Sequence, residues 1–251
     1  MVENPFSPRH PINPKYFINR GEILANLEKS LKTTAESDIP KPDNIALLGR
    51  WGIGKTSTLR KFCDSAVNDT EINTFISHIE LSPVSCRDVR SFLIKTLEDI
   101  EKNSLSKLSL YGHIRKELSE WARVSGNYAL NQAEGNHLFS KFEDALKDLW
   151  FGILTPFGIN AAVLMFDNLH YLVKGNEGVF YDLKSMFQRL SFDGCNYMLL
   201  ITGCEDLLDN GNLSEIQRFF DRYRLGLFNL SETRDAILKP VELSGLDVTL
   251  D

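Results

Sequence analysis

The sequence predicts an α/β fold of three layers, in which helices cover both faces of a five-stranded parallel sheet. Short apolar runs with strand character alternate along the chain with segments of helical periodicity. One run, 161–167, is apolar up to its final Asp, as expected for a parallel strand buried on both faces. The 251 residues, 43% of them hydrophobic, suffice for one large domain, alone or with a small appendage.

Residues 1–40 are expected to form a leader and a helix that pack on the core. Residues 1–19 hold four of the nine prolines and lack hydrophobic periodicity, which predicts extended chain lying along another surface. From 20 to about 32, apolar residues recur at helical spacing. Residues 33–43 are polar and contain two prolines, so they are expected to form a loop.

The core is predicted to span residues 41–231. Its first strand covers 44–48, and a helix runs from Thr56 to about 68. A second strand, 74–81, is rich in β-branched and aromatic residues. Ser85 is placed to cap the helix that follows, which is expected to end near Lys102.

A helical insert is predicted over 104–155, between the second and third strands, in two segments that separate near 125–127. The uncharged stretch 149–166 approaches the minimum length of a membrane-spanning helix. A cluster of turn-forming residues in its middle favours a helix end, a loop and the third strand, 161–167, and leaves the membrane segment as the alternative.

The second half of the core continues the alternation of helix and strand. A helix over 179–190 precedes a strand over 197–202, and a helix over 215–222 precedes a strand over 225–230. Ser231 is then expected to cap a helix over 232–238. In such a sheet, ligands bind at the carboxyl ends of the strands.

The octapeptide Gly49–Thr56 fits the phosphate-binding pattern G-x-x-x-x-G-K-[ST]. Glycines let the backbone N–H groups turn toward a phosphate at the start of a helix. Lys55 would bridge β- and γ-phosphate oxygens, and the Thr56 hydroxyl would bind Mg²⁺. A chance match in a glycine-rich turn is the alternative, which the strand before and the helix after the motif oppose. The expected nucleotide contacts are Gly49, Arg50, Trp51, Gly52, Ile53, Gly54, Lys55, Thr56 and Ser57.

Asp167 ends an apolar strand, as the Mg²⁺-binding carboxylate of such a site should, although it could be an ordinary strand-end residue. The next residue is Asn168, whose amide can orient water but cannot accept its proton. Glu80, at the end of the second predicted strand, is the candidate substitute base; the alternative is a solvated side chain. His170 is interpreted as a polar loop residue.

Two further positions are candidates for sensing the γ-phosphate. Thr202 closes a buried strand, and its hydroxyl could contact the γ-phosphate or the attacking water. Arg218, Arg222 and Arg224 precede the last predicted strand, and Arg222 is the candidate to stabilise transferred charge from a neighbouring subunit. Solvent-facing arginines are the alternative.

The net charge of −6 argues against a surface that binds nucleic acid non-specifically. Four cysteines without paired spacing indicate reduced thiols, and the N-terminus has no signal-peptide pattern, so a cytoplasmic protein is expected.

These motifs, in this order, resemble those of AAA+/STAND-type P-loop ATPases, particularly the archaeal and bacterial branch near the replication initiators. The resemblance includes Asn4-Pro5-Phe6 and the stretch 16–22, which matches the family's entry segment beside the adenine except at Asn19 and Gly21. It implies that 232–251 begin a helical lid, which the sequence to Asp251 would leave incomplete. KAP-type P-loop ATPases are a weaker resemblance, based on Trp51-Gly52.

The sequence therefore predicts an ATP- and Mg²⁺-binding P-loop ATPase that acts as a nucleotide-dependent switch. A regulatory scaffold that hardly hydrolyses ATP is the first alternative, because of Asn168. The ATPase half of a DNA-binding protein is the second, with DNA contacts in a further C-terminal domain. ATP or ADP is the expected ligand, a homo-oligomer is expected if Arg222 acts between subunits, and no protein partner is indicated.

Overall fold

A single parallel sheet of five strands forms the centre of the molecule. The computed structural model describes residues 4–6, 10–37, 39–69, 71–106, 108–124, 137–173, 178–208 and 214–245. All strand pairs are parallel, and the strand order is β2-β3-β4-β1-β5. The strands are β1 (Ile45–Leu48), β2 (Thr74–Glu80), β3 (Ala161–Asp167), β4 (Tyr197–Gly203) and β5 (Asp221–Arg224). The predicted five-stranded parallel sheet is confirmed.

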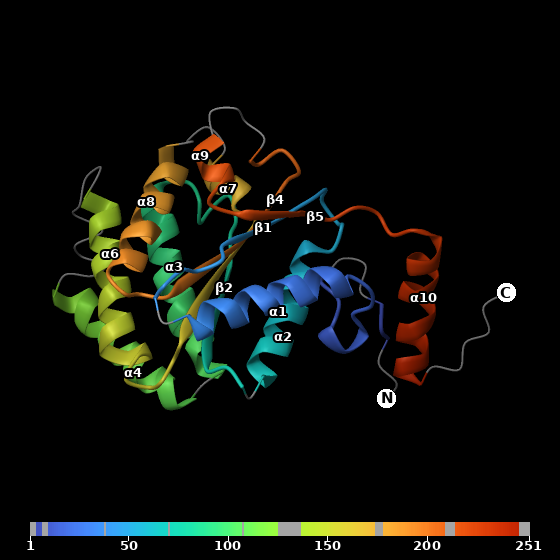
Figure 1. The fold of residues 1–251 in the computed structure, drawn as a ribbon, viewed down its shortest axis with the longest axis horizontal. Coiled ribbons are helices and arrows are strands. Elements are labelled where there is room, and N and C mark those ends of the chain that lie inside the picture. The colour runs from blue at the N-terminus through green and yellow to red at the C-terminus, as the bar shows by residue number, and fades with distance from the viewer. Residues whose placement is uncertain are drawn as a thin grey trace.

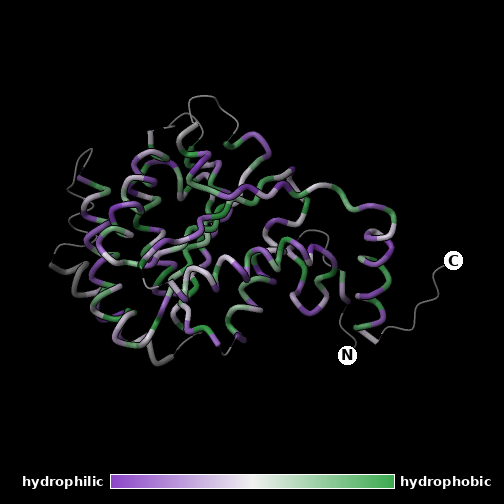
Figure 2. The backbone as a smooth tube through the Cα atoms, viewed as in Figure 1, coloured by the Kyte–Doolittle hydropathy of each residue, from purple (hydrophilic) through white to green (hydrophobic). Residues whose placement is uncertain are grey.

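Two helical layers enclose this sheet, and each makes its own hydrophobic core (Figure 1). One layer consists of α1 (Gly21–Glu36) and α2 (Lys55–Asn68). The other consists of α3 (Val89–Asn103), α4 (Leu108–Val124), α6 (His137–Leu149) and α8 (Gly178–Phe192). In Figure 2 the central strands carry the most continuous hydrophobic colour. The three-layer prediction is confirmed.

Strand β3 shows why its sequence is apolar throughout. Ala161, Val163 and Met165 pack in the core under α1 and α2, while Ala162, Leu164 and Phe166 pack in the core under α3 and α8. Because side chains alternate along a strand, Asp167 emerges on the face of the sheet covered by α2. This alternation brings the carboxylate to the phosphate-loop side.

The predicted helical insert lies between β2 and β3. It comprises a 3₁₀ turn (Ser104–Ser106), α4, α6 and a π-helical turn (Trp150–Leu154). The predicted separation near residues 125–127 lies outside the described residues. The uncharged stretch 149–166 is a helix end, a turn and most of β3, and none of the described helices is long and apolar enough to cross a membrane.

Helix α3 begins later than predicted. Its N-cap is Asp88, whose carboxylate accepts a hydrogen bond from Ser91 N at 2.7 Å. Ser85 instead closes a turn with Ser82, whose backbone N–H donates to Ser85 Oγ at 2.9 Å. The prediction of Ser85 as the cap was wrong because both residues have N-cap chemistry, and the turn at 82–85 uses Ser85 first.

The last strand was also predicted in the wrong place. Strand β5 covers Asp221–Arg224 rather than 225–230, and the helix expected over 215–222 is only α9 (Ser214–Gln217). Within the described part of the chain, edge strand β5 pairs with β1 alone and is largely exposed. It therefore carries charged residues and lacks the apolar pattern that marks a buried strand. Helix α10 (Leu230–Ser244) is capped by Asn229, which forms a capping box with Glu232, and not by Ser231.

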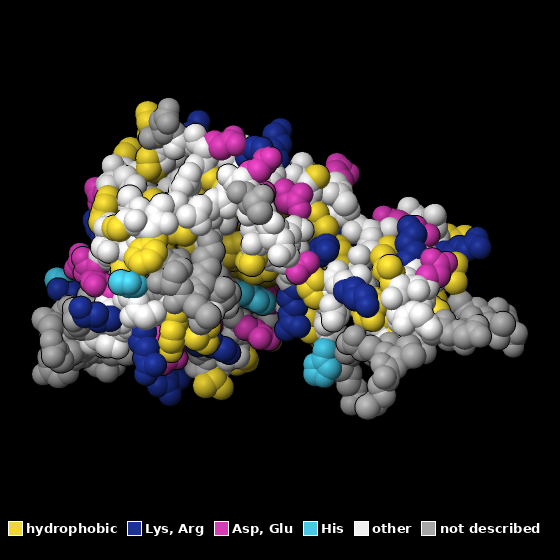
Figure 3. Space-filling model, turned by 90° about the horizontal axis from the view of Figure 1, so that it is seen from below, with side chains coloured by type: hydrophobic (Ala, Val, Ile, Leu, Met, Phe, Trp, Pro, Cys, Tyr) yellow, Lys and Arg dark blue, Asp and Glu magenta, His cyan; other side chains and the backbone are white. Residues whose placement is uncertain are grey.

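The leader and α10 lie together at one end of the molecule, away from α4 and α6 (Figure 1). The leader contains a 3₁₀ turn (Pro14–Tyr16), and Tyr16 is only 2% exposed. Asn19 Nδ2 donates to the Glu232 carbonyl in α10 at 2.7 Å. Figure 3 shows acidic and basic side chains intermixed over the face seen from below.

A short helix, α7 (His170–Val173), follows β3 and contains His170, which was predicted to lie in a loop.

Candidate functional site

The phosphate loop is built on backbone conformations that favour glycine. Gly52 and Gly54 have φ values of +78° and +100°. A Cβ atom added to Gly49 would lie 3.0 Å from Ile53 Cγ2 and 3.1 Å from the Leu225 carbonyl oxygen. The loop therefore needs its first glycine for space and the other two for backbone geometry, and helix α2 starts directly after it.

The Lys55 ammonium folds back over the loop. Its Nζ donates to the carbonyl oxygens of Gly49 at 2.7 Å and Arg50 at 2.9 Å. Burial lowers the pKa of Lys55, and the Asp167 carboxylate partly offsets that effect. A phosphate in the loop would give this half-buried ammonium an anionic partner in place of neutral carbonyls.

Thr56 and Asp167 meet although they are 111 residues apart in sequence. Thr56 Oγ1 donates to Asp167 Oδ2 at 2.7 Å. On the other side, Thr202 Oγ1 donates to Asp167 Oδ1 at 2.5 Å and accepts a hydrogen bond from Asn168 N at 2.8 Å. The ends of β3 and β4 and the start of α2 thus converge on one carboxylate.

Asp167 remains a carboxylate despite its burial. Burial raises the pKa of Asp167, but the neighbouring His78 and the hydroxyls of Thr202 and Thr56 together outweigh this and lower it. A hydroxyl beside an ionised carboxylate is the oxygen-donor pair that Mg²⁺ accepts in phosphate-binding sites. The two residues predicted to bind metal therefore suit that ion chemically.

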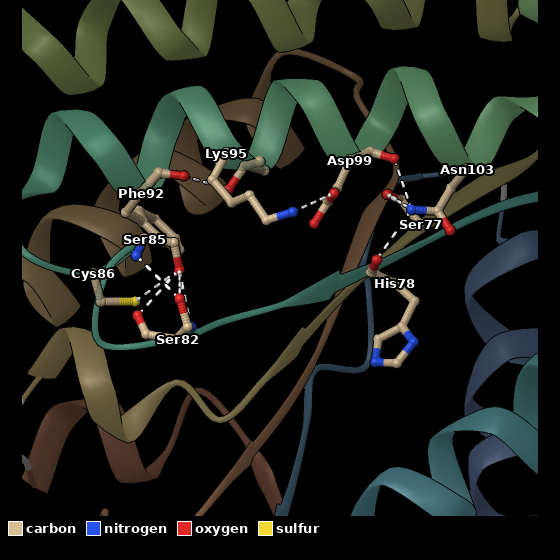
Figure 4. Close-up of polar contacts among 10 residues, drawn as sticks. Ser77, His78, Ser82, Ser85, Cys86, Phe92, Lys95, Asp99 and Asn103 are labelled. Carbon is tan, nitrogen blue, oxygen red and sulfur yellow. Dashed lines mark hydrogen bonds and ion pairs between the residues drawn. The ribbon is translucent and has the colours of Figure 1, made fainter. Parts of the chain in front are cut away.

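His78 is a member of this group that the sequence interpretation missed. Its Nε2 lies 3.5 Å from Asp167 Oδ2. In Figure 4 its ring points away from α3, while the Asn103 amide on α3 donates to the His78 carbonyl at 3.0 Å. A strand's period of two would have revealed it, since His78 is two residues before Glu80.

Glu80 lies in register with Asp167, on the strand next to β3, and is exposed. Partners in parallel register share a face of the sheet, so Glu80 lies on the same face as Asp167 and His78. The predicted proximity of Glu80 to the phosphate loop depended on the strand order, and the order places β2 one strand beyond β3. Glu80 therefore lies next to Asp167 but one strand farther from the phosphate loop, at the edge of the candidate site.

The backbone conformation at residue 168 explains why an asparagine is found there. Its φ is +66°, in the left-handed region that asparagine tolerates better than most residues. The residue sits in the turn after β3, with its N–H held by Thr202. The amide side chain is therefore compatible with this turn before any catalytic demand is considered.

Arg222 lies elsewhere. It is in β5, in register with Ala46, whose side chain faces the α3 and α8 layer. Arg222 is exposed on that face, opposite α2, and Arg224 follows two residues later at the level of Leu48. The fold does not bring either arginine to the Thr56–Asp167 pair within this chain.

A cavity of about 170 Å³ adjoins the phosphate loop on the side of the leader. Arg20 closes part of its wall: its guanidinium lies 4.4 Å from the centre of the Phe228 ring and donates to the Gly226 carbonyl at 2.5 Å. The cavity is smaller than a typical whole-ligand pocket, which is a few hundred Å³, and so suits one planar group. It is lined by Ile12, Tyr16, Phe17, Ile18, Arg20, Gly52, Ile53, Gly54, Ser57, Thr58, Phe228 and Ala236.

The structure is similar to solved structures of replication initiators and a related ATPase. The ADP form of the Aeropyrum pernix ORC2 protein matches 94% of this chain and 55% of its own, with a TM-score of 0.62 and 15% identity. The A. pernix ORC1 protein in complex with DNA matches 90% of this chain and 50% of its own, at 0.54 and 12%. The Walker-type ATPase PABY2304 of Pyrococcus abyssi matches 93% and 60%, at 0.53 and 14%.

At these identities the likeness establishes the fold. The chain has the fold of AAA+ P-loop ATPases, of the kind found in archaeal replication initiators, as the sequence resemblance implied. It spans about half the length of the initiators that it matches. Neither a protein-family model nor a curated protein matches the sequence.

Proposed function

We propose that this chain is an ATP- and Mg²⁺-binding AAA+ module that acts as a nucleotide-dependent switch. The observation that carries the proposal is the hydrogen bond between Thr56 Oγ1 and Asp167 Oδ2. It joins the end of the phosphate loop to the buried strand that supplies the metal carboxylate. A glycine-rich turn that matched the motif by chance would not require this pairing.

Each part of the site has a separate task in this proposal. Residues 49–57 would wrap the phosphates with backbone N–H groups, and Lys55 would contact the β- and γ-phosphate oxygens. Thr56 and Asp167 would hold Mg²⁺, which when bound would neutralise charge on those oxygens. The adenine would enter the cavity between the leader and α10. A triphosphate and a diphosphate would then differ in their contacts with Thr56 and Asp167.

Calorimetric titration with MgATP tests this proposal. Lys55→Ala is expected to remove detectable binding, because the β- and γ-phosphates lose their cation. Lys61→Ala, in the same helix and ion-paired to Asp64, is the matched control and should bind as the unchanged chain does. Equal affinity of the Lys55→Ala variant and the unchanged chain would reject the phosphate-loop assignment.

ATP hydrolysis does not follow from ATP binding, because the residue after Asp167 is Asn168, whose side-chain amide cannot accept a proton from water. We propose slow hydrolysis with Glu80 as the substitute base; the alternative, a scaffold that binds but hardly hydrolyses, is favoured by Asn168. Steady-state phosphate release distinguishes them. Turnover that falls in Glu80→Gln but not in Glu98→Gln, an exposed control on α3, supports the base. Turnover that survives Glu80→Gln would exclude it.

Two further roles complete the proposal. Thr202 would act on the γ-phosphate through Asp167, whose carboxylate it orients. Arg222 would act only on a neighbouring subunit's nucleotide, since it lies on the opposite face of the sheet within its own chain. Sedimentation of the chain with MgATP tests the second role, because a strictly monomeric, active ATPase has no use for such an arginine.

DNA binding is the remaining candidate, and similar solved structures motivate it. The ORC1 protein of A. pernix and the Drosophila ORC are both described bound to DNA. This chain covers 50% and 48% of those chains and carries a net charge of −6, so DNA contacts would come from a further C-terminal domain. A cytoplasmic location remains the expectation from the cysteine spacing and the N-terminal sequence. Salt-dependent DNA binding by this chain alone would show contacts within the ATPase core instead.

A further inference from the structure

A second cavity, remote from the phosphate loop, lies at the amino ends of the strands. It has a volume of about 490 Å³, and one wall is the segment 39–44, which leads into β1. The other wall is the C-terminal half of α8 with the turn after it. An adjoining cavity of about 310 Å³ shares Gln188, Arg218 and Phe219 with the first, so the two form one groove. In Figure 1 the chain before β1 passes beside α8.

Large apolar side chains stand at the mouth of this groove. Ile39 is 76% exposed on one wall, and Phe192 is 90% exposed on the other. Phe187 and Phe219 lie deeper, the first buried and the second half-buried. Exposed apolar side chains that line one groove are typical of a surface that binds another apolar group.

The wall 39–44 is fixed rather than loose. Ser191 Oγ on α8 donates to the Pro40 carbonyl at 2.8 Å, and Asp43 N donates to Thr34 Oγ1 at 3.2 Å. Asn44 Oδ1 accepts from Leu199 N in β4 at 2.8 Å. Because Pro40 and Pro42 have no N–H, this wall cannot add a peptide as a new strand. An occupant would be recognised through its side chains.

The charge of the groove is opposite to that of the whole chain. Lys41, Lys184 and Arg218 line it, and no described aspartate or glutamate is among the lining residues. Asp43, in the same segment as Lys41, is a nearby acidic group and offsets part of the charge of Lys41. The chain as a whole has 34 acidic and 28 basic residues. Three cations around an apolar floor complement an apolar side chain flanked by carboxylates.

We propose that this groove docks an acidic, amphipathic peptide segment of a protein partner. An aromatic or aliphatic side chain would enter between Ile39 and Phe192, and neighbouring carboxylates would reach Lys41, Lys184 and Arg218. A nucleic acid fits less well, because it would need a longer basic track than three cations and a net charge of −6 provide. Since the phosphate loop begins at the other end of β1, the two sites are separate.

Selection of random displayed peptides against the whole chain tests the proposal. The enriched peptides are expected to combine Asp or Glu with Phe, Trp or Leu. Fluorescence polarisation with the enriched peptide, labelled, should show about tenfold weaker binding to Phe192→Ser and to Arg218→Glu. The matched controls Leu243→Ser and Arg234→Glu, both on α10, should bind as the unchanged chain does, and so should Lys55→Ala.

Three results of the peptide experiments would overturn the proposal, and a fourth comes from competition with DNA. The first three are no enrichment, enrichment of basic peptides, and equal binding by the two groove variants and the controls. Displacement of the peptide by single-stranded DNA at low concentration would assign the groove to nucleic acid instead. Circular dichroism of Phe192→Ser and Arg218→Glu ensures that a loss of binding is not a loss of fold.

Discussion

Thr202 and Asp167 share a short hydrogen bond at the ends of two neighbouring strands. The Thr202 hydroxyl donates to Asp167 Oδ1 at 2.5 Å, is fully buried, and accepts the Asn168 N–H. One hydroxyl therefore fixes both the carboxylate and the turn that follows it. Direct contact with a γ-phosphate would require Thr202 to give up this bond.

Thr202→Val should remove both interactions with little change in shape. We expect the free energy of unfolding to fall by about 1–3 kcal/mol, because a buried N–H and a buried carboxylate each lose a partner. Urea denaturation measures this change, with the exposed Thr33→Val as control. A variant as stable as the control would mean that water replaces the hydroxyl.

Replacing Asn168 by glutamate should lower the stability of the chain and raise its rate of ATP hydrolysis. Asn168→Glu forces a less tolerant residue into a φ of +66°, so we expect a loss of about 1 kcal/mol in unfolding free energy. If the missing carboxylate limits hydrolysis, the same variant should release phosphate faster. Asn168→Gly is the control, since it relieves the backbone without supplying a base. Equal turnover in both variants would mean that the missing carboxylate does not limit the rate of hydrolysis.

Arg20 should control how firmly the segment before α10 is held. Arg20→Ala removes the hydrogen bond to Gly226 and the contact with Phe228. We expect faster chymotryptic cleavage at Phe228 and weaker MgATP binding, because the cavity loses one wall. Arg60→Ala, an exposed residue on α2, should change neither.

The cysteines should differ from ordinary thiols in their pH dependence. Burial raises the pKa of Cys63 to about 11 and that of Cys195 to about 12. Only the thiolate reacts, so alkylation of the folded chain should be slow at about pH 8 and rise by about tenfold per pH unit up to the pKa. Mass spectrometry of each cysteine follows this. Fast alkylation of Cys195 at the lower pH would show that α8 opens locally.

Much of the core was predictable because its signals are local. The strands β1, β3 and β4 are apolar runs, and β2 is rich in β-branched and aromatic residues. The phosphate loop is a contiguous motif, so its position and its chemistry could be predicted together. The edge strand β5 failed for the opposite reason: with one neighbour and little burial, Asp221–Arg224 has no apolar pattern. Capping failed at Ser85 and Ser231 because chemically equivalent residues lay a few positions away.

The sequence predicted only some of the residues that meet at the candidate site. Asp167 and Thr56 follow from a strand end and a motif, but the contact of His78 with Asp167 depends on strand order and register. The placement of Arg222 opposite α2 depends on register as well. Which strands are neighbours is a long-range property of the fold, and local patterns along the sequence do not reveal it.

The cavity beside the phosphate loop is lined by chain segments more than 200 residues apart, since Ile18 and Arg20 contribute to it together with Phe228 and Ala236. A ligand in that cavity would therefore act as a cross-link that closes almost the whole polypeptide into a ring. Pulling on the two ends of the molecule should then load this cavity before it loads the central sheet. Nucleotide occupancy would be measurable as the force needed to separate the ends, without any assay of hydrolysis.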